Sequence, residues 1–226
     1  MTSAKLPTTR CARCLASELQ IAASGVQLGA TLGMPDKARG AVIFAHGSGS
    51  SRHSPRNRFV AQALHDHGFA TLMMDLLTSE EERVDDATGE LRFDMPLLAR
   101  RLADAAQWWR TQSPAPSVPL GYFGASTGAG AALLAAVDDF GISSIVSRGG
   151  RPDLAGEALS HVRAPTLLIV GSRDRTVLDL NRQAAAQLRA PVEIAIVENA
   201  THLFPEPGAL EEVARLAGEW FARYAS

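Results

Sequence analysis

A serine between two glycines is the residue in this 226-residue chain best suited to nucleophilic chemistry. Ser126 lies in the segment 124–128, Gly-Ala-Ser-Thr-Gly, which fits the pattern G-x-S-x-G. In that pattern a sharp turn between a strand and a helix holds the serine in a strained backbone conformation and exposes its hydroxyl. The string alone is a weak signal. Its context supports it, because an apolar run precedes it at 118–120 and the run 131–137 is typical of a buried helix.

A serine hydroxyl is a poor nucleophile near neutral pH and needs a base within hydrogen-bond reach. His202 is the candidate base, because it follows the last expected strand of the chain. The other histidine after Ser126 is His161, which is expected on a helix away from the strand ends. The remaining histidines precede the serine and are interpreted as structural or solvent-facing: His46, His53, His65 and His67.

A carboxylate is needed on the second ring nitrogen of the base, where it fixes the tautomer and stabilises the imidazolium. Asp174 is the candidate because it directly leaves the apolar run 166–170. Asp153 and Asp179 are the alternatives. The chain order would then be serine, acid, base, and all three residues would follow strands of one sheet.

The negative charge of a tetrahedral intermediate needs preorganised N–H donors. Two backbone groups are candidates for this oxyanion hole: the N–H of Thr127, at the start of the helix after the serine, and the N–H of Ser48. Ser48 belongs to a glycine and serine loop at 46–51, directly after an apolar strand. Gly47 in the same loop would let the backbone pass close to a bound substrate.

Arginines follow two of the expected strand ends, and most surface arginines are solvated or paired. The alternative is that Arg148, or an arginine of the loop at 52–58, receives a carboxylate or phosphate of the substrate as a bidentate partner. The arginines in question are Arg52, Arg56, Arg58, Arg148 and Arg151.

The elements that must position these residues alternate between strand and helix from residue 41 onward. Their strands are continuous apolar runs, which predicts a mostly parallel sheet of about seven to eight strands with helices on both faces. A period-2 pattern over 19–32 predicts a hairpin at one sheet edge. We expect one α/β domain over 16–226 and a flexible arm over 1–15. Ligands bind at the carboxyl ends of such strands.

Four segments receive more specific predictions. Residues 77–93 are charged and are interpreted as an irregular, solvated excursion rather than a lid. Asn57 is expected to cap a helix over 58–67, and Asp179 or Asn181 to begin a helix through residue 188. No large insertion separates residues 142 and 165, so we expect no large lid and a shallow cleft suited to compact acyl groups.

Composition limits the function classes. The net charge of −2, with 46% hydrophobic and 20% charged residues, is typical of a globular protein and gives no indication of nucleic-acid or membrane binding. Cys11 and Cys14 form a C-x-x-C without the context of a redox or zinc site. We expect no metal and no cofactor, a small-molecule substrate, a monomer or homodimer, and, without an apolar leader in 1–10, a cytoplasmic location.

The chain resembles the α/β-hydrolase superfamily, and within it the small, lidless members similar to dienelactone hydrolase. The resemblance covers about 19–224 and rests on His-Gly-Ser-Gly at 46–49, the motif at 124–128, Gly-Ser-Arg-Asp at 171–174, and His202. Dienelactone hydrolase carries a cysteine nucleophile, whereas this chain has Ser126, which favours a general carboxylesterase. The resemblance implies a serine hydrolase that cleaves a small ester or lactone through an acyl-enzyme. Thioester or amide cleavage, acyl transfer and a non-catalytic binding module remain alternatives.

Overall fold

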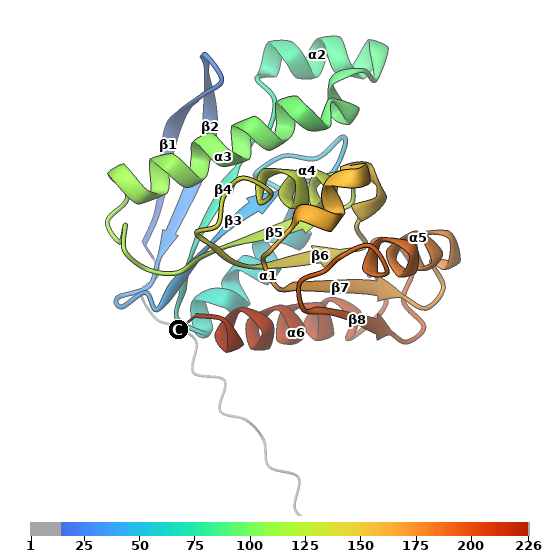
Figure 1. Cartoon of the computed structure of the whole chain (residues 1–226). Coiled ribbons are helices and arrows are strands. Elements are labelled where there is room, and N and C mark those ends of the chain that lie inside the picture. The colour runs from blue at the N-terminus through green and yellow to red at the C-terminus, as the bar shows by residue number, and fades with distance from the viewer. Residues whose placement is uncertain (1–14, 226) are drawn as a thin grey trace, which may run out of the picture.

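Eight strands form one twisted sheet in the computed structural model, which describes residues 15–225 (Figure 1). The strands are β1 (Leu15–Ala23), β2 (Val26–Met34), β3 (Gly40–Ala45), β4 (Phe69–Met74), β5 (Leu120–Ala125), β6 (Ile142–Arg148), β7 (Thr166–Gly171) and β8 (Val192–Val197). Their order across the sheet is β1-β2-β4-β3-β5-β6-β7-β8. The pairs β1–β2 and β2–β4 are antiparallel, and the pairs from β4 to β8 are parallel. The predicted mostly parallel α/β fold is therefore confirmed.

The apolar runs of the sequence become the centre of the sheet. Every residue of β3, β4, β5 and β7 is buried, as expected for strands that are covered on both faces. The edge hairpin turns at Ser24 and Gly25, whose φ angles of 50° and 82° suit a tight two-residue turn.

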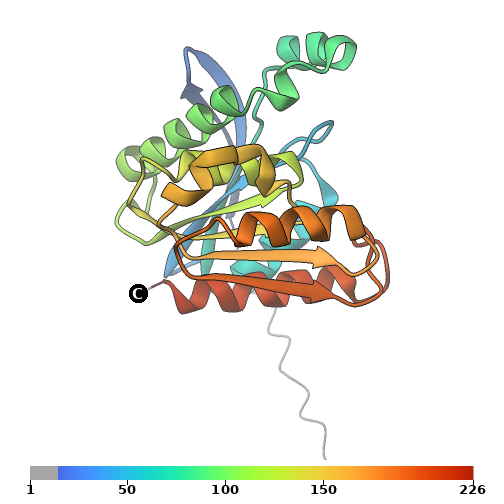
Figure 2. The same cartoon turned by 45° about the vertical axis from the view of Figure 1, so that its right-hand side comes forward.

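Helices cover the sheet in two layers (Figures 1 and 2). One face carries α1 (Pro55–Asp66) and α6 (Ala209–Arg223), and the other carries α3 (Met95–Gln112), α4 (Thr127–Ala135), the 3-10 segment η2 (Pro152–His161) and α5 (Arg175–Ala185). Each layer has its own apolar cluster against the sheet. On the α1/α6 face, the rings of Phe44 and Phe123 lie 4.8 Å apart between their centres. The carboxyl ends of the parallel strands lie between these layers at one edge of the sheet.

The segment at 77–93 is helical, so the prediction of an irregular excursion was wrong. It forms α2 (Ser79–Thr88) and the 3-10 turn η1 (Leu91–Phe93), which stand above the end of α3 in Figure 1. A capping box begins α2: the Thr78 hydroxyl accepts the N–H of Glu81, and the Glu81 carboxylate accepts the N–H of Thr78. Thr-x-x-Glu is a helix-start pattern that is visible in the sequence.

Two other helix boundaries differ from the prediction. Ser54 rather than Asn57 caps α1, because its hydroxyl accepts the N–H of Asn57, which is itself buried within the helix. Helix α5 begins at Arg175, directly after Asp174, and not near residue 180. The predicted arm over 1–15, with Cys11 and Cys14, lies outside the described residues except for its last residue, where β1 begins. Across 15–225, no helix combines the length and apolar character needed to cross a bilayer.

Candidate active site

Ser126 occupies the sharp turn between β5 and α4 with φ 50° and ψ −123°, a conformation that costs a non-glycine residue strain energy. Both flanking glycines are required by close packing. A Cβ on Gly124 would lie 2.4 Å from the Cα of Ala129, and a Cβ on Gly128 would lie 2.3 Å from the carbonyl oxygen of Ala45. The two glycines therefore let the turn pack against β3 and the start of α4 while Ser126 stays partly exposed.

Asp174 and His202 come together after β7 and β8. The Nδ1 of His202 lies 2.6 Å from the Oδ2 of Asp174, within hydrogen-bond distance. The Asp174 side chain is 15% exposed and that of His202 is 39% exposed, so the acid is covered while the ring reaches the surface. Nδ1 donates its proton to the carboxylate in this arrangement, which leaves Nε2 as the nitrogen that can accept one.

The loop that carries His202 is held from both sides of the histidine. The N–H and the hydroxyl of Thr201 both donate to Oε1 of Glu206, at 3.1 and 2.7 Å. The bond from the Thr201 hydroxyl lowers the pKa of Glu206 below its ordinary value. Phe204 is buried against the α1/α6 face with φ 55°. These contacts hold the loop on both sides of His202, and sequence reasoning missed them because no local pattern marks Glu206 as a loop anchor.

Ser126 and His202 both lie close to the end of β6. The N–H of Ser126 donates to the carbonyl of Arg148 at 3.2 Å. The next residue, Gly149, has φ 50°, and a Cβ there would lie 2.9 Å from the carbonyl oxygen of His202. Within residues 15–225, no hydrogen bond joins the Ser126 hydroxyl to the His202 ring. Such bonds are often long without substrate and tighten when it binds.

The loop after β3 lies directly against the nucleophile. A Cβ on Gly47 would approach the Cβ of Ser126 to 2.9 Å and its Oγ to 3.6 Å, so only glycine fits there. The Ser48 N–H donates to the Thr127 hydroxyl at 3.0 Å, and the two hydroxyl oxygens are also 3.0 Å apart. An oxyanion bound by Ser48 would have to replace the Thr127 hydroxyl as acceptor. Thr127 itself begins α4, whose N-terminal N–H groups suit a developing negative charge.

His46 ties this loop to the end of β4. Its Nδ1 lies 3.0 Å from the carbonyl of Gly47, and its Nε2 accepts the N–H of Leu76 at 3.0 Å. One ring nitrogen therefore donates and the other accepts, which requires the neutral imidazole. Burial lowers the pKa of His46 and so favours the same form. The geometry gives His46 a structural position, as the sequence indicated.

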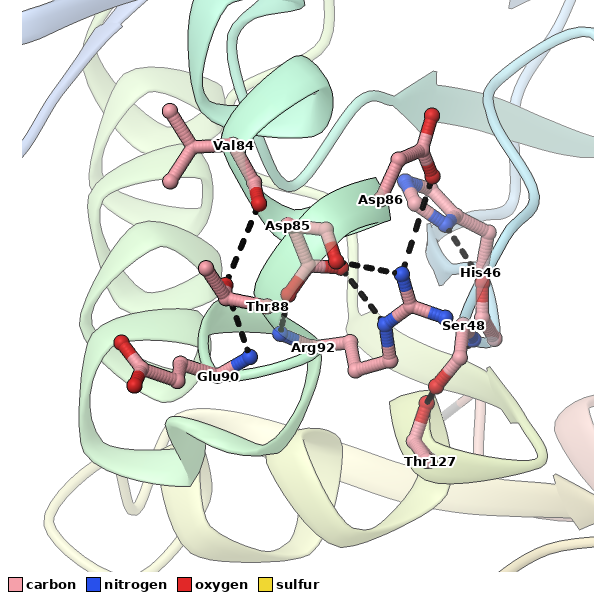
Figure 3. Close-up of polar contacts among 10 residues, drawn as sticks. His46, Ser48, Val84, Asp85, Asp86, Thr88, Glu90, Arg92 and Thr127 are labelled. Atoms are coloured by element: carbon pink, nitrogen blue, oxygen red, sulfur yellow. Dashed lines mark hydrogen bonds and ion pairs between the residues drawn. The ribbon is translucent and has the colours of Figure 1, made fainter.

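A cavity of about 290 Å³ opens beside the loop after β3 on the α3/α4 side of the sheet. It is lined by His46, Gly47, Ser48, Gly49, Ser50, Ser51, Leu76, Leu77, Glu82, Asp85, Asp86, Arg92, Leu98 and Thr127. Figure 3 shows Arg92 with Asp85 and Asp86 near the paired hydroxyls of Ser48 and Thr127. Burial and the nearby carboxylates of Asp75 and Asp86 raise the pKa of Glu82. The segment at 77–93 thus forms one wall of the cavity.

Buried ion pairs hold this wall in place. Arg101 on α3 is 1% exposed and donates to both carboxylate oxygens of Glu81, at 2.6 and 2.8 Å, and to the carbonyl of Leu76 at 2.7 Å. The hydrogen bonds from Arg101 lower the pKa of Glu81. Arg92 donates to Asp85, which is almost fully buried, at 2.7 Å. These contacts therefore join η1 and α3 to α2 beside the cavity.

The alternative triad residues contact other partners. Asp153 pairs with Arg151 at 2.7 Å, and Asp179 pairs with Arg182 at 3.1 Å on the surface of α5. His161 is exposed and lies 3.2 Å from the hydroxyl of Ser160. Neither acid nor His161 takes part in the arrangement around Ser126. Within 15–225, no group of three or more metal-ligating side chains has the geometry of a metal site.

The arginines singled out in the sequence divide into two groups. Arg52 pairs with Glu18 and Asp75, Arg151 pairs with Asp153, and the Arg58 guanidinium lies 2.7 Å from the His53 ring. Arg148 is only 7% exposed and, within the part of the chain that the structure describes, makes a single side-chain hydrogen bond, 3.3 Å long, to the side-chain oxygen of Asn57. The expectation of solvated or paired arginines is therefore wrong for Arg148, which is buried without a carboxylate.

Comparison with known proteins identifies a matching family and similar solved structures. The family model described as "Alpha/beta hydrolase domain" matches residues 38–214. A dienelactone hydrolase structure from Anabaena variabilis is 51% identical, with a TM-score of 0.90 over 94% of this chain and 99% of that one. Est1E from Butyrivibrio proteoclasticus is 14% identical with a TM-score of 0.76 over 92% of this chain and 98% of that one, which shows a shared fold.

Two curated relatives from Mycobacterium tuberculosis strains are 56% identical over 205 residues and carry the name "Putative phosphoribosyl transferase". The match covers 90% of this chain, but the chain spans only 45% of the length of those proteins. The fold, the strained serine turn and the family match over 38–214 all indicate the same family. This chain belongs to the α/β-hydrolase family and is similar to dienelactone hydrolase.

Proposed function

We propose that this protein is a serine hydrolase that cleaves a small carboxylic ester or lactone through an acyl-enzyme. The observation that carries the proposal is the 2.6 Å contact between Asp174 and His202, in a chain whose candidate nucleophile Ser126 occupies a strained turn after β5. The contact leaves Nε2 of His202 to act as the base. The relative from Anabaena variabilis, a dienelactone hydrolase by name, is similar over nearly the whole chain and supports hydrolytic chemistry.

The reaction follows from these positions. Nε2 of His202 takes the hydroxyl proton as the Oγ of Ser126 bonds to the substrate carbonyl carbon, and Asp174 stabilises the imidazolium. Collapse of the tetrahedral intermediate breaks the bond to the leaving oxygen, which receives the proton from His202. Water then attacks the acyl-enzyme with His202 again acting as base, and the acid product leaves with Ser126 restored. N–H groups at Thr127 and in the loop after β3 are the proposed oxyanion donors.

The cavity favours compact substrates. Its volume of about 290 Å³ is at the low end of the range for small-molecule sites. Two of its lining residues, Gly47 and Thr127, lie directly beside Ser126, so one end of a substrate can enter it while the carbonyl lies at the serine. The part of the mycobacterial relatives that matches this chain includes the α/β-hydrolase region, so the proposal rests on the site and not on their name.

A panel of 4-nitrophenyl esters of increasing acyl length, with lactones and thioesters, tests this proposal. We expect short acyl esters to have the highest kcat/KM and Ser126→Ala to abolish turnover. A preference for acyl chains beyond about ten carbons would contradict the compact site. Folded protein that hydrolyses none of these substrates would favour a binding module with the same fold.

A further inference from the structure

Arg148 and its neighbour Arg56 lack a carboxylate partner among the described residues. The Nε and Nη1 groups of Arg148 are fully buried and have no hydrogen-bond partner, and the same holds for the Nε of Arg56. Neither arginine forms a salt bridge with any acid in 15–225, whereas nearby Arg52 and Arg151 both do. Among residues 15–225, the only side-chain hydrogen bond of Arg148 is its long bond to the amide oxygen of Asn57, a neutral acceptor.

Burial of a guanidinium in this way is unfavourable. An arginine stays charged in proteins, and a buried charge is normally paired with an opposite one because desolvation is costly. Burial and the neighbouring Arg56 lower the pKa of Arg148 to about 10, which still leaves the group charged at neutral pH. The second cation makes the local potential more positive. An anion between the two side chains would relieve both the desolvation and the repulsion.

Arg148 lies beside the turn that carries the nucleophile, and Arg56 is its charged neighbour. Arg148 is the last residue of β6, and its carbonyl accepts the N–H of Ser126. The next residue, Gly149, packs against His202. The side chain of Arg148 points to the α1/α6 face, where it meets Asn57 in the first turn of the 12-residue helix α1. Arg56 lies in the same turn, so the helix N-terminus adds a further preference for negative charge.

We propose that Arg148 and Arg56 bind an oxyanion of the substrate, a carboxylate or a phosphate, on the α1 side of Ser126. The inference rests on the proposed hydrolase function and names the substrate class of the same site. The cavity lies on the opposite, α3/α4 side of the nucleophile and is lined by three carboxylates and one arginine. An anionic group would be disfavoured there. The substrate therefore carries an anionic group at one end, bound by the arginines, and an uncharged group at the other end, in the cavity.

Matched ester pairs that differ only in charge test the proposal. One pair is 4-nitrophenyl hydrogen adipate and its methyl ester, which places the carboxylate on the acyl side. The other is 3-carboxyphenyl butanoate and its methyl ester, which places it on the leaving group. We expect the wild-type protein to favour the anionic member of one pair by about tenfold or more in kcat/KM, as for loss of one charge-assisted hydrogen bond. Competition by inorganic phosphate and by acetate against a neutral ester would show which oxyanion is preferred.

Two arginines of the same helix provide a matched control. Arg56→Gln and Arg58→Gln remove the same charge from α1, but Arg58 is exposed and contacts His53 instead. We expect the anionic preference to fall about tenfold in Arg56→Gln and in Arg148→Met and to stay within about twofold of wild type in Arg58→Gln. Neutral ester hydrolysis should be retained in Arg58→Gln. Arg148→Lys, which keeps the buried charge but loses the fork of donors, should show an intermediate preference.

The possible results separate this inference from the proposed function. Ser126-dependent hydrolysis with no anionic preference in either pair would overturn the oxyanion site and leave the hydrolase in place. An equal loss of preference in Arg56→Gln and Arg58→Gln would overturn it as well, because the effect would then be one of net charge. Absence of any ester hydrolysis by folded wild-type protein would contradict the proposed function and, with it, the inference.

Discussion

Ser126 and its neighbours show how much of the site depends on single atoms. The glycines on either side of the serine cannot accept a methyl group without collision, and Gly47 keeps the loop after β3 against the nucleophile. A side chain also positions this loop: the Thr127 hydroxyl accepts the Ser48 N–H and so fixes the orientation of the loop. Catalysis of the proposed kind needs such preorganisation, because donors that must reorient during reaction stabilise less.

Replacing Thr127 tests this positioning. Thr127→Val keeps the shape of the side chain but removes the acceptor, so we expect kcat to fall about tenfold with little change in the melting temperature. Thr127→Ser retains the hydroxyl and should restore activity close to wild type. Steady-state kinetics on one neutral ester provide the measurement. A Val variant as active as wild type would show that the loop does not depend on Thr127.

At this scale, the sequence could indicate which residues follow strands but not which atoms they meet. Asp174 and His202 were identifiable because each leaves the carboxyl end of an expected strand, and the structure brings them together. The contact between Ser48 and Thr127 joins residues 79 positions apart, so it depends on how β3 packs against the start of α4. Arg148 could be placed near the site, but its burial without an acid is visible only once the fold brings Asn57 at the start of α1 to the end of β6.

Among the elements, α2 differs most from the sequence prediction, because it is a helix and forms part of the cavity wall. Its charged sequence has one buried residue, Asp85, so it lacks the apolar periodicity by which a helix is normally predicted. The capping box at Thr78 and Glu81 was the available signal. The position of the helix depends on partners outside it, above all the buried Arg101 on α3.

Two adjacent glutamates of α2 test how this wall is held. Glu81→Gln leaves the buried charge of Arg101 without its carboxylate, so we expect the free energy of unfolding to fall by about 3 kcal/mol. Glu80→Gln removes an equal charge from a surface pair with Arg83, and the expected change is below about 1 kcal/mol. Urea denaturation of both variants gives the comparison. Similar values for the two would mean that the Arg101 contact does not anchor α2.

The stability of the whole molecule should depend on pH through two buried histidines. Burial lowers the pKa of His46 and of His65, with opposing but smaller effects from Asp75 and Asp66 respectively. Below the ordinary histidine pKa of about 6.5, the unfolded chain therefore binds more protons than the folded one. The free energy of unfolding should fall as the pH drops below about 6.5, until the folded pKa values are passed. Above that pH the contribution is fully present.

Melting temperatures between pH 8 and pH 5 measure this dependence. His65→Gln should flatten the curve in that range, because one of the two buried groups no longer titrates. His161→Gln, which changes an exposed histidine, should leave the shape of the curve unchanged. A wild-type curve that is flat from pH 7 to pH 5 would contradict the neutral, buried state of both rings.

The most direct test of the central claim is labelling with an active-site-directed fluorophosphonate, followed by peptide mapping. We expect one modified residue, Ser126, no label in Ser126→Ala, and labelling slowed by roughly a thousandfold or more in Asp174→Asn, in which the His202 ring loses its anionic partner. Folded wild-type protein that stays unlabelled, a label on a different serine, or an Asp174→Asn variant that reacts as fast as wild type would contradict it.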